Sequence, residues 1–472
     1  MRILMLGWEL PPFFAGGVGV VTQNLTAALA NRGVELVFIM PKGPEGATSP
    51  HMRLLIGDVE SERPMSAPPA PPLTEDQVVE ELEPGKVVVR REPGGAILET
   101  WEVPSLLGPY AGPAEYEARW KEFAGDLRLG VEAARKRQRR VPGAPGPTGT
   151  APPPKKKAGP LYGPNLLEEI DRFANRVVDL VQAEGIHFDL IHAHDWTTFP
   201  AGLRLREATG KPLAIHVHIT EYDKTGGKGA DPRVWAVEHA GLHGADKVIA
   251  VSQRVKRQCV ERYFADPGRI EVVYNAAEGA KRKPRRIARR TPTVLFLGRL
   301  TLQKGPDYFV RAAARVLEVR PDVTFVIAGT GDMLPKLTEL VAELGIGDRV
   351  VFAGFVGRDK IYDLYEHADV FVVPSVSEPF GIVPLEAMQS GVPVILSRQT
   401  GASEILRHVL KVDFWDVEAM AERILEAVSY PRLRAEISRR AENEVKRLTW
   451  ADVAHKTEKL YRRMLDQPPP PR

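Results

Sequence analysis

The fold of this chain is decided by the stretch Ser377-Glu378-Pro379-Phe380-Gly381-Ile382-Val383-Pro384-Leu385-Glu386. It follows a short apolar run that is typical of a buried strand, and it leads into a helical pattern. Glu378 and Glu386 therefore bracket a turn from strand to helix. Open parallel sheets bind ligands at the carboxyl ends of their strands. The free N–H groups of a helix start bind anions, and carboxylates accept hydrogen bonds from hydroxyls. The stretch predicts a site for a sugar phosphate.

Outward from this stretch, apolar strand-like runs alternate with helical patterns. Such alternation predicts an α/β fold of two Rossmann-like, doubly wound parallel sheets with right-handed crossovers. The clearest helices are expected at Val18–Arg32, Leu166–Glu184 and Trp450–Leu465. The expected strands are Ile3–Leu6, Leu36–Met40, Leu190–His192, Ala214–His218, Lys247–Val251, Thr293–Leu297, Thr324–Ala328, Val350–Ala353, Val370–Pro374 and Pro393–Leu396.

Two poorly patterned segments interrupt this order. Residues 44–164 are Pro-rich and predict a long insertion, with a hairpin within Leu82–Trp101 and disorder over 135–160, since that composition buries too little apolar area. A second break at Ala280–Thr291 predicts a boundary between domains at 1–285 and 286–449. Both breaks carry basic runs without interleaved aromatic residues, which favours solvated linkers over nucleic-acid binding.

Composition limits the class of protein. The chain has 472 residues, 43% hydrophobic and 26% charged, with a net charge of +3, so no global field favours nucleic acid as a partner. A single cysteine, Cys259, excludes an intrachain disulfide and every cysteine-based metal motif. The first apolar run is too short for a signal peptide, and no run reaches the ~20 residues of a membrane helix. We expect a cytoplasmic protein without a transmembrane segment, for which peripheral contact with a membrane stays open.

A glycine cluster lies near the start, at Gly16-Gly17-Val18-Gly19. Successive glycines let backbone N–H groups approach an oxyanion. The dinucleotide fingerprint places its glycines directly after the strand, whereas here Trp8 to Gly16 intervene, which disfavours a nicotinamide cofactor. A structural turn explains the cluster about as well as a binding loop does.

Two cations, Arg299 and Lys304, follow the first expected strand of the second domain. Fixed positive charge at a strand end suits a diphosphate leaving group, whose charge grows in the transition state. The alternative is a pair of ordinary surface cations.

Four histidines end two expected strands, His192 and His194 on one and His216 and His218 on the next. Alternation places each pair on one face of the sheet, so a zinc site is geometrically conceivable. We favour strand-end histidines that bond sugar hydroxyls or backbone, and the sequence prediction is that no metal is bound.

These motifs together resemble the GT-B glycosyltransferases that retain anomeric configuration, nearest to family 4 and to the glycogen and starch synthases. The resemblance covers Met1–Pro41 and about Ile186 to Leu465. Its most specific part is the pair of glutamates with seven residues between them. The run His192–Trp196 is similar to one in glycogen synthases.

The resemblance implies two domains facing a central cleft, with the helix at 450–466 crossing back to the N-terminal domain. It implies catalytic roles for His218, at the sugar's reacting face, for Arg299 and Lys304, on the diphosphate, and for Glu378, on the donor sugar. The remaining implied substrate contacts are Gly16, Gly17, Asp195, Gly331, Val356, Phe380, Gly381, Ile382, Val383 and Glu386, the last on the ribose.

The implied reaction moves a hexosyl unit, with glucosyl as the first choice, from a nucleotide-diphosphate sugar such as ADP- or UDP-glucose to a carbohydrate acceptor, without a cofactor. An α-glucan acceptor is one reading. Ala15 stands where glycogen synthases usually carry lysine, so a family-4 enzyme with a lipid, small-sugar or cell-surface polysaccharide acceptor is the alternative. A phosphorylase, a nucleotide-sugar epimerase and a non-catalytic sugar-binding protein are the competing classes.

Overall fold

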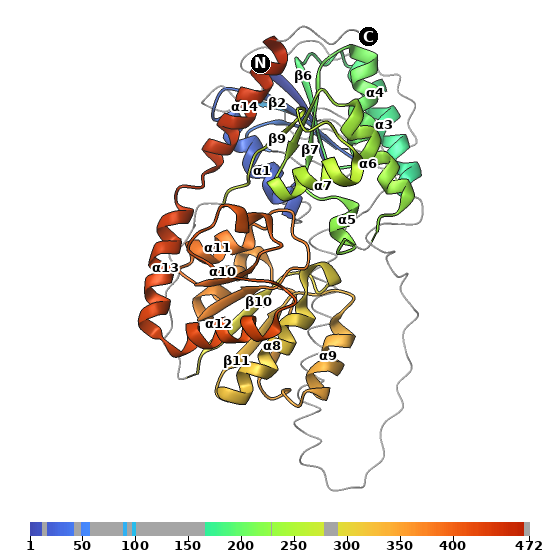
Figure 1. Ribbon diagram of the computed structural model, residues 1–472. Helices are drawn as coiled ribbons and strands as arrows, with labels where there is room; N and C mark the ends of the chain where they lie inside the picture. The colour runs from blue at the N-terminus through green and yellow to red at the C-terminus, as the bar shows by residue number, and fades with distance from the viewer. Residues whose placement is uncertain are drawn as a thin grey trace, which may run out of the picture.

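The computed structural model describes residues 1–11, 17–41, 49–56, 88–91, 97–100, 166–227, 229–277 and 291–466. These residues form two α/β domains, each built on one parallel sheet, stacked one above the other in Figure 1. The predicted disorder over 135–160 and the predicted boundary at 285 lie outside the described residues.

The N-terminal domain contains a seven-stranded sheet in the order β3-β2-β1-β6-β7-β8-β9. All its strand pairs are parallel. The bounds are β1 Arg2–Leu6, β2 Glu35–Met40, β3 Arg53–Ile56, β6 Leu190–His194, β7 Leu213–Val217, β8 Lys247–Ala250 and β9 Ile270–Val272.

The C-terminal domain contains a six-stranded parallel sheet in the order β12-β11-β10-β13-β14-β15. Every expected strand is present, and β10 and β11 have the predicted bounds. The bounds are β10 Thr293–Leu297, β11 Thr324–Ala328, β12 Val350–Gly354, β13 Val370–Val373, β14 Val394–Ser397 and β15 Leu410–Val412.

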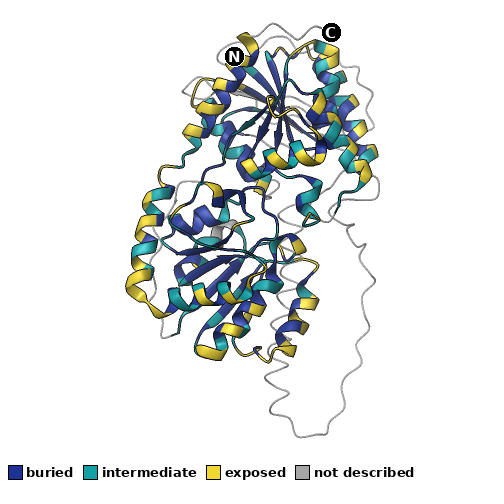
Figure 2. Cartoon of the chain, in the orientation of Figure 1, coloured by how far each residue is buried: buried dark blue, intermediate teal, exposed yellow. Residues whose placement is uncertain are grey.

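Helices cover both faces of each sheet, so the strands are buried and the exposed positions lie on outward helix faces (Figure 2). The bounds of the helices are α1 Gly17–Ala30, α3 Leu166–Ala183, α4 Phe199–Thr209, α5 Glu221–Lys224, α6 Pro232–Gly244, α7 Gln253–Tyr263, α8 Pro306–Val319, α9 Leu334–Glu343, α10 Arg358–His367, α11 Val383–Gln389, α12 Val417–Ser429, α13 Pro431–Val445 and α14 Trp450–Asp466, with short 3₁₀ turns η1 Leu302–Lys304 and η2 Gly401–Glu404.

Strand alternation sorts the N-terminal core into two faces. Leu4 and Leu6 of β1 pack with the α3 and α4 side, whereas Ile3 and Met5 pack with α1 and α14. The C-terminal helix α14 thus belongs to the core of the first domain, and its Tyr461 is fully buried there. Figure 1 shows α14 beside α1 at the top of the molecule, beyond α13 of the second domain.

Each sheet reverses its strand order at one point, between β1 and β6 in the first and between β10 and β13 in the second. Such switch points are where open α/β sheets bind ligands. The loops at the carboxyl ends of the two sheets contact each other, for example where Ser252, after β8, donates 2.6 Å to the carbonyl of Pro379, after β13.

The expected hairpin within Leu82–Trp101 is confirmed as an antiparallel pair, β4 (Val88–Arg91) and β5 (Ile97–Thr100). Among the helices of the described ranges, none combines the length and the apolar character needed to cross a membrane.

Candidate functional site

Backbone hydrogen bonds join Glu378, in the loop after β13, to the segment that follows β14. The Glu378 N–H donates 3.1 Å to the carbonyl of Gln399, and its own carbonyl accepts from Gly401 at 2.9 Å. Gly381 ends the turn with φ +87°, and a Cβ there would lie 3.1 Å from Cγ of Glu378. This glycine is therefore required both by its backbone conformation and by the closeness of the carboxylate side chain.

Lys304 and Glu378 form an ion pair across the switch point of the second sheet. The ammonium comes from η1, after β10, and the carboxylate from the loop after β13. Their side chains are only 20% and 10% exposed. Ser375 also faces the same carboxylate oxygen, at 3.5 Å. The sequence assigned the two residues to different parts of a donor, and the structure joins them directly.

The loops after β10 and β11 pack backbone against backbone. A Cβ on Gly331 would lie 2.2 Å from the carbonyl oxygen of Leu300, so only glycine permits this approach. Arg299, in the same loop as Leu300, is exposed. Val356 lies half-buried in the loop after β12. All these residues follow the carboxyl ends of neighbouring strands.

The remaining predicted donor contacts lie at the start of α11. Phe380 and Glu386 are buried, at 2% and 7% exposure, whereas Gly381, Ile382 and Val383 are half-buried. Glu386 is held in the first turn of α11, where its N–H donates 3.1 Å to the carbonyl of Ile382. The predicted strand-to-helix turn between the two glutamates is therefore present.

In the first domain, Asp195 directly follows β6 and has the left-handed φ of 60°, unusual for a residue with a side chain. Its Oδ1 accepts from the N–H of His218 at 2.7 Å and from that of Ile219 at 3.3 Å. Burial raises the pKa of Asp195 to about 7, although these two bonds and Lys224 oppose the rise. Asp195 thus fixes the backbone of the loop that carries His218.

The four strand-end histidines form one buried stack, whereas strand alternation predicted only that each pair shares a face of the sheet. Neighbouring rings lie 4.1–5.4 Å apart between centroids. His218 shares a 2.9 Å hydrogen bond with His194, and His192 shares one of 2.5 Å with the hydroxyl of Tyr461. Burial lowers the pKa of all four, that of His194 to about 3, so the rings are neutral.

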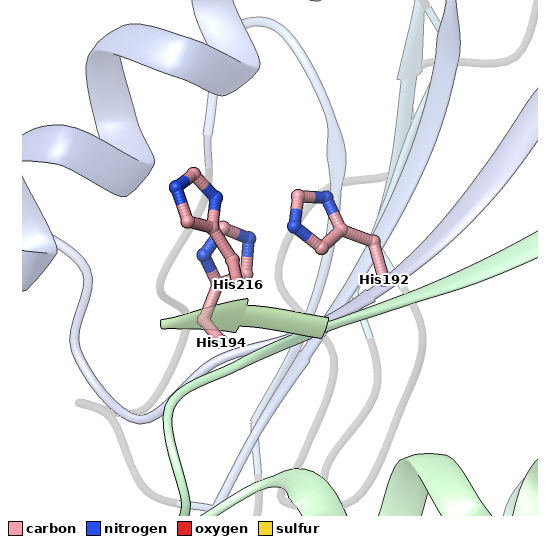
Figure 3. A group of neighbouring side chains, drawn as sticks. All are labelled: His192, His194 and His216. Carbon is pink, nitrogen blue, oxygen red and sulfur yellow. The ribbon is translucent and has the colours of Figure 1, made fainter. Parts of the chain in front are cut away.

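Within the described residues, His192, His194 and His216 offer one ring nitrogen each within 4.8 Å of one another. Figure 3 shows their rings gathered on one side of the strands that carry them. The sequence prediction that no metal is bound stays a prediction.

The glycine cluster is only partly described. Gly16 lies outside the described residues. Gly17 begins α1 and is exposed, with open space where a Cβ would lie. Two residues on, the N–H of Gly19 donates 3.1 Å to the carboxylate of Glu9. The N–H of Gly19 is thus held by a carboxylate of the chain itself.

The sequence did not indicate the contacts that join the two domains around Glu378. Ser377 donates 2.6 Å to Asp223, which follows β7, and accepts 2.9 Å from Arg254 of α7. Glu404 of the second domain accepts from the first two N–H groups of α7, at 2.8 and 2.7 Å. Ser377 lies inside the most specific motif, but no sequence signal pairs it with Asp223.

Known families match the chain in three segments. The glycosyl transferases group 1 model matches residues 278–444, the glycosyltransferase family 4 model matches 132–281, and the starch synthase catalytic domain model matches 2–63. The first of these covers the sheet that carries Lys304 and Glu378.

Two curated relatives each match more than half of the chain. An uncharacterized glycosyltransferase of Methanocaldococcus jannaschii is 33% identical over 58% of this chain and 75% of its own. A D-inositol 3-phosphate glycosyltransferase of Salinispora tropica is 30% identical over 62% and 68%, respectively.

Solved structures share the fold at lower identity. Sucrose-phosphate synthase of Thermosynechococcus elongatus aligns over 98% of both chains, with a TM-score of 0.65 and 20% identity. Anabaena HepE, in complex with UDP and glucose, aligns over 98% of this chain and 100% of its own, with a TM-score of 0.62 and 15% identity. With the two facing parallel sheets and the relatives above, these matches show that the chain belongs to the group 1, family 4 glycosyltransferases of GT-B fold.

Proposed function

We propose that this glycosyltransferase moves a hexosyl unit, with glucosyl as the first choice, from a nucleotide-diphosphate sugar to a hydroxyl of its acceptor with retention of configuration. The observation that carries the proposal is the Lys304–Glu378 ion pair at the switch point of the second sheet. A largely buried cation and a carboxylate side by side suit the two halves of such a donor, an anionic diphosphate and a ring of hydroxyls.

In this proposal Lys304 and Arg299 bind the diphosphate. The negative charge on the leaving diphosphate grows as the glycosidic bond breaks, so these cations stabilise the transition state more than the ground state. When the donor binds, the Lys304 ammonium leaves the Glu378 carboxylate and pairs with the phosphates. The freed carboxylate then accepts hydrogen bonds from hydroxyls of the sugar. Glu386 binds the ribose, and Val356 and Gly331 lie at the base.

The acceptor hydroxyl attacks on the face that the diphosphate leaves, and the diphosphate takes its proton. The transition state has oxocarbenium character, as in other glycosyl chemistry. His218 lies at the reacting face of the sugar, held there through the backbone bond from its N–H to Asp195. Closure of the two domains over the donor would exclude water, which limits hydrolysis of the donor.

For the donor we propose ADP- or UDP-glucose, and the shared fold with a protein solved with UDP and glucose favours UDP. The acceptor is a carbohydrate or another polyol. The name of the Salinispora relative adds a phosphorylated cyclitol to the α-glucan suggested by the sequence, so both belong in the test.

A donor-by-acceptor matrix tests the proposal. Nucleoside diphosphate release is followed for UDP-, ADP- and GDP-sugars with maltooligosaccharides, inositol 3-phosphate and simple sugars as acceptors. NMR of the product then reads the anomeric configuration. We expect one donor to dominate, with release stimulated by an acceptor and an axial–axial or equatorial–equatorial relation between donor and product linkage.

Each competing class gives its own result in this matrix. A nucleotide-sugar epimerase changes the donor without an acceptor, and a phosphorylase releases sugar phosphate from a glucan and needs pyridoxal phosphate. A sugar-binding protein binds a donor in calorimetry without turnover. An inverted product, or neither binding nor turnover with any donor, overturns the proposal.

A further inference from the structure

The histidine stack contains three side chains that the proposed transfer reaction does not use, since only His218 is assigned to the substrate. His192 and His194 come from alternate positions of β6, and His216 of β7 lies opposite His194 in the strand register. Their exposures are 0%, 1% and 0%. Three imidazoles are therefore gathered in a part of the core that bulk water does not reach.

The nitrogens of this stack are poorly satisfied by the protein. Within the described ranges, Nε2 of His192, Nε2 of His194 and both ring nitrogens of His216 have no hydrogen-bond partner. Buried polar atoms are nearly always paired, and each orphan costs about 1–3 kcal/mol. One ion can take a single nitrogen from each ring, so three of these atoms share a possible missing partner and the second nitrogen of His216 is left over.

The nitrogens that are satisfied follow the pattern of metal-bound histidine. Nδ1 of His192 is held by the Tyr461 hydroxyl and Nδ1 of His194 by His218. A ligating imidazole typically uses one nitrogen for the metal and the other for an orienting hydrogen bond. Both rings therefore have Nδ1 held by a hydrogen bond and Nε2 without a hydrogen-bond partner among the described residues.

Against the sequence prediction that no metal is bound, we propose that His192, His194 and His216 bind a late first-row transition metal ion, with Zn²⁺ as the first choice. Neutral imidazole is a preferred ligand of these ions, and three imidazoles form the protein part of a His₃ site whose fourth ligand is a water molecule. Tetrahedral Zn–N bonds place ligand nitrogens about 3.4 Å apart. The three nitrogens already lie within 4.8 Å of one another, and binding requires the stacked rings to turn until their in-plane lone pairs converge on the ion.

The metal would act on the fold and not on the donor. It joins β6 to β7 and, through Tyr461, both strands to α14, so it fixes the C-terminal helix on the first domain. Arg299, Lys304 and the diphosphate chemistry lie in the second domain and do not involve it. The proposal is thus independent of which sugar is transferred.

Metal content and thermal unfolding test this site on the full chain without a polyhistidine tag. After equilibration with Zn²⁺ and removal of the excess, we expect about one equivalent per chain by elemental analysis. The melting temperature should rise with Zn²⁺ and fall after chelation, because a ligand that binds only the folded state stabilises it. His216→Leu should lose both effects.

A second histidine group supplies the matched control. His239 and His243 stack on α6 at 4.1 Å between centroids, and His243 is exposed. The variant His239→Ala/His243→Ala should keep the bound equivalent. If this variant loses the metal while His216→Leu keeps it, binding is adventitious and the proposal fails.

Cobalt spectroscopy covers the case in which His216→Leu does not fold. Co²⁺ added to the wild-type chain should give the intense visible bands of a tetrahedral site, and Zn²⁺ should displace it. A wild-type chain that shows neither these bands, nor a stoichiometric equivalent of zinc, nor a change in melting temperature overturns the proposal outright.

Discussion

The Ser377 hydroxyl donates a 2.6 Å hydrogen bond to Oδ1 of Asp223, although the two residues are 154 positions apart and belong to different domains. Asp223 is fully buried, and burial raises its pKa. Its other oxygen accepts from the N–H and hydroxyl of Thr220 at 3.1 and 3.0 Å. The residue that precedes Glu378 therefore ties the donor loop to the first domain.

Ser377→Ala should loosen the closed arrangement of the domains. The substitution leaves Oδ1 of Asp223 buried without its hydroxyl donor, at a cost of about 1–3 kcal/mol. We expect a larger radius of gyration by small-angle X-ray scattering and a raised KM for the donor. Ser438→Ala is the control, because that buried hydroxyl bonds only within its own helix, to the carbonyl of Arg434. Equal effects in both variants would contradict this role.

Lys304→Ala should lower kcat by about 10²–10³-fold, as expected for loss of one charge on the leaving group. It also leaves the Glu378 carboxylate largely buried without its cation, so some stability is lost. The double variant Lys304→Ala/Glu378→Gln should regain melting temperature without regaining activity. If activity returns with stability, the lysine is structural only.

Gly381→Ala should reduce activity more than stability. Alanine at φ +87° costs about 1–2 kcal/mol, and its Cβ would lie 3.1 Å from Cγ of Glu378. Gly391→Ala is matched, since Gly391 has φ +71° but open space at the Cβ position. Both variants should lose similar melting temperature, and only Gly381→Ala should lose turnover. Equal activities would show that the closeness to Glu378 has no functional effect.

Glu238→Gln should flatten the fall of stability with rising pH. Burial raises the pKa of Glu238 from 4.5 to about 8, while its oxygens accept from the N–H of Glu221 and the hydroxyl of Tyr263. Between these two pKa values the folded chain keeps the proton and the unfolded chain releases it. Stability therefore falls as pH rises through this window. Melting temperatures from pH 4.5 to 8 for both proteins test this, and parallel curves would contradict it.

Tyr461→Phe should release α14 from the first domain. The hydroxyl is a described partner of buried His192, and its loss costs about 1–3 kcal/mol. Hydrogen exchange over 450–466 should become faster. The exposed pair Arg463–Glu271, at 2.6 Å, offers the contrast, since Arg463→Ala should change stability by about 0–1 kcal/mol. A larger effect of Arg463→Ala would show that the surface pair fixes the helix.

The sheets could be predicted from the sequence because parallel strands are buried on both faces and therefore read as continuous apolar runs. β10 and β11 were expected with the bounds they have. The three-residue strands β9 and β15 were not expected, because each mixes apolar with half-buried polar positions and is too short to show a pattern. The strand β3, Arg53–Ile56, was also missed, since it lies within 44–164, which the sequence predicted to be an insertion.

The site was predictable where one short motif contains it and not where distant segments meet. The turn from Glu378 to Glu386 could be predicted from the ten residues Ser377–Glu386 alone. The stacking of four histidines followed in part from alternation, but the register that sets His194 opposite His216 needed the assembled sheet. The bond from Ser377 to Asp223 joins separate domains, and no local pattern encodes it.

The placement of α14 also sets an order of events during synthesis. A ribosome makes β1 first and reaches α14 only after the entire second domain, yet Ile3, Met5, Leu460 and Tyr461 share one core. Until then the apolar face that α14 covers is exposed on the first domain, and exposed apolar surface makes nascent chains prone to aggregation. The apolar surface that α14 covers in the finished fold therefore stays without this cover until translation has passed the whole second domain.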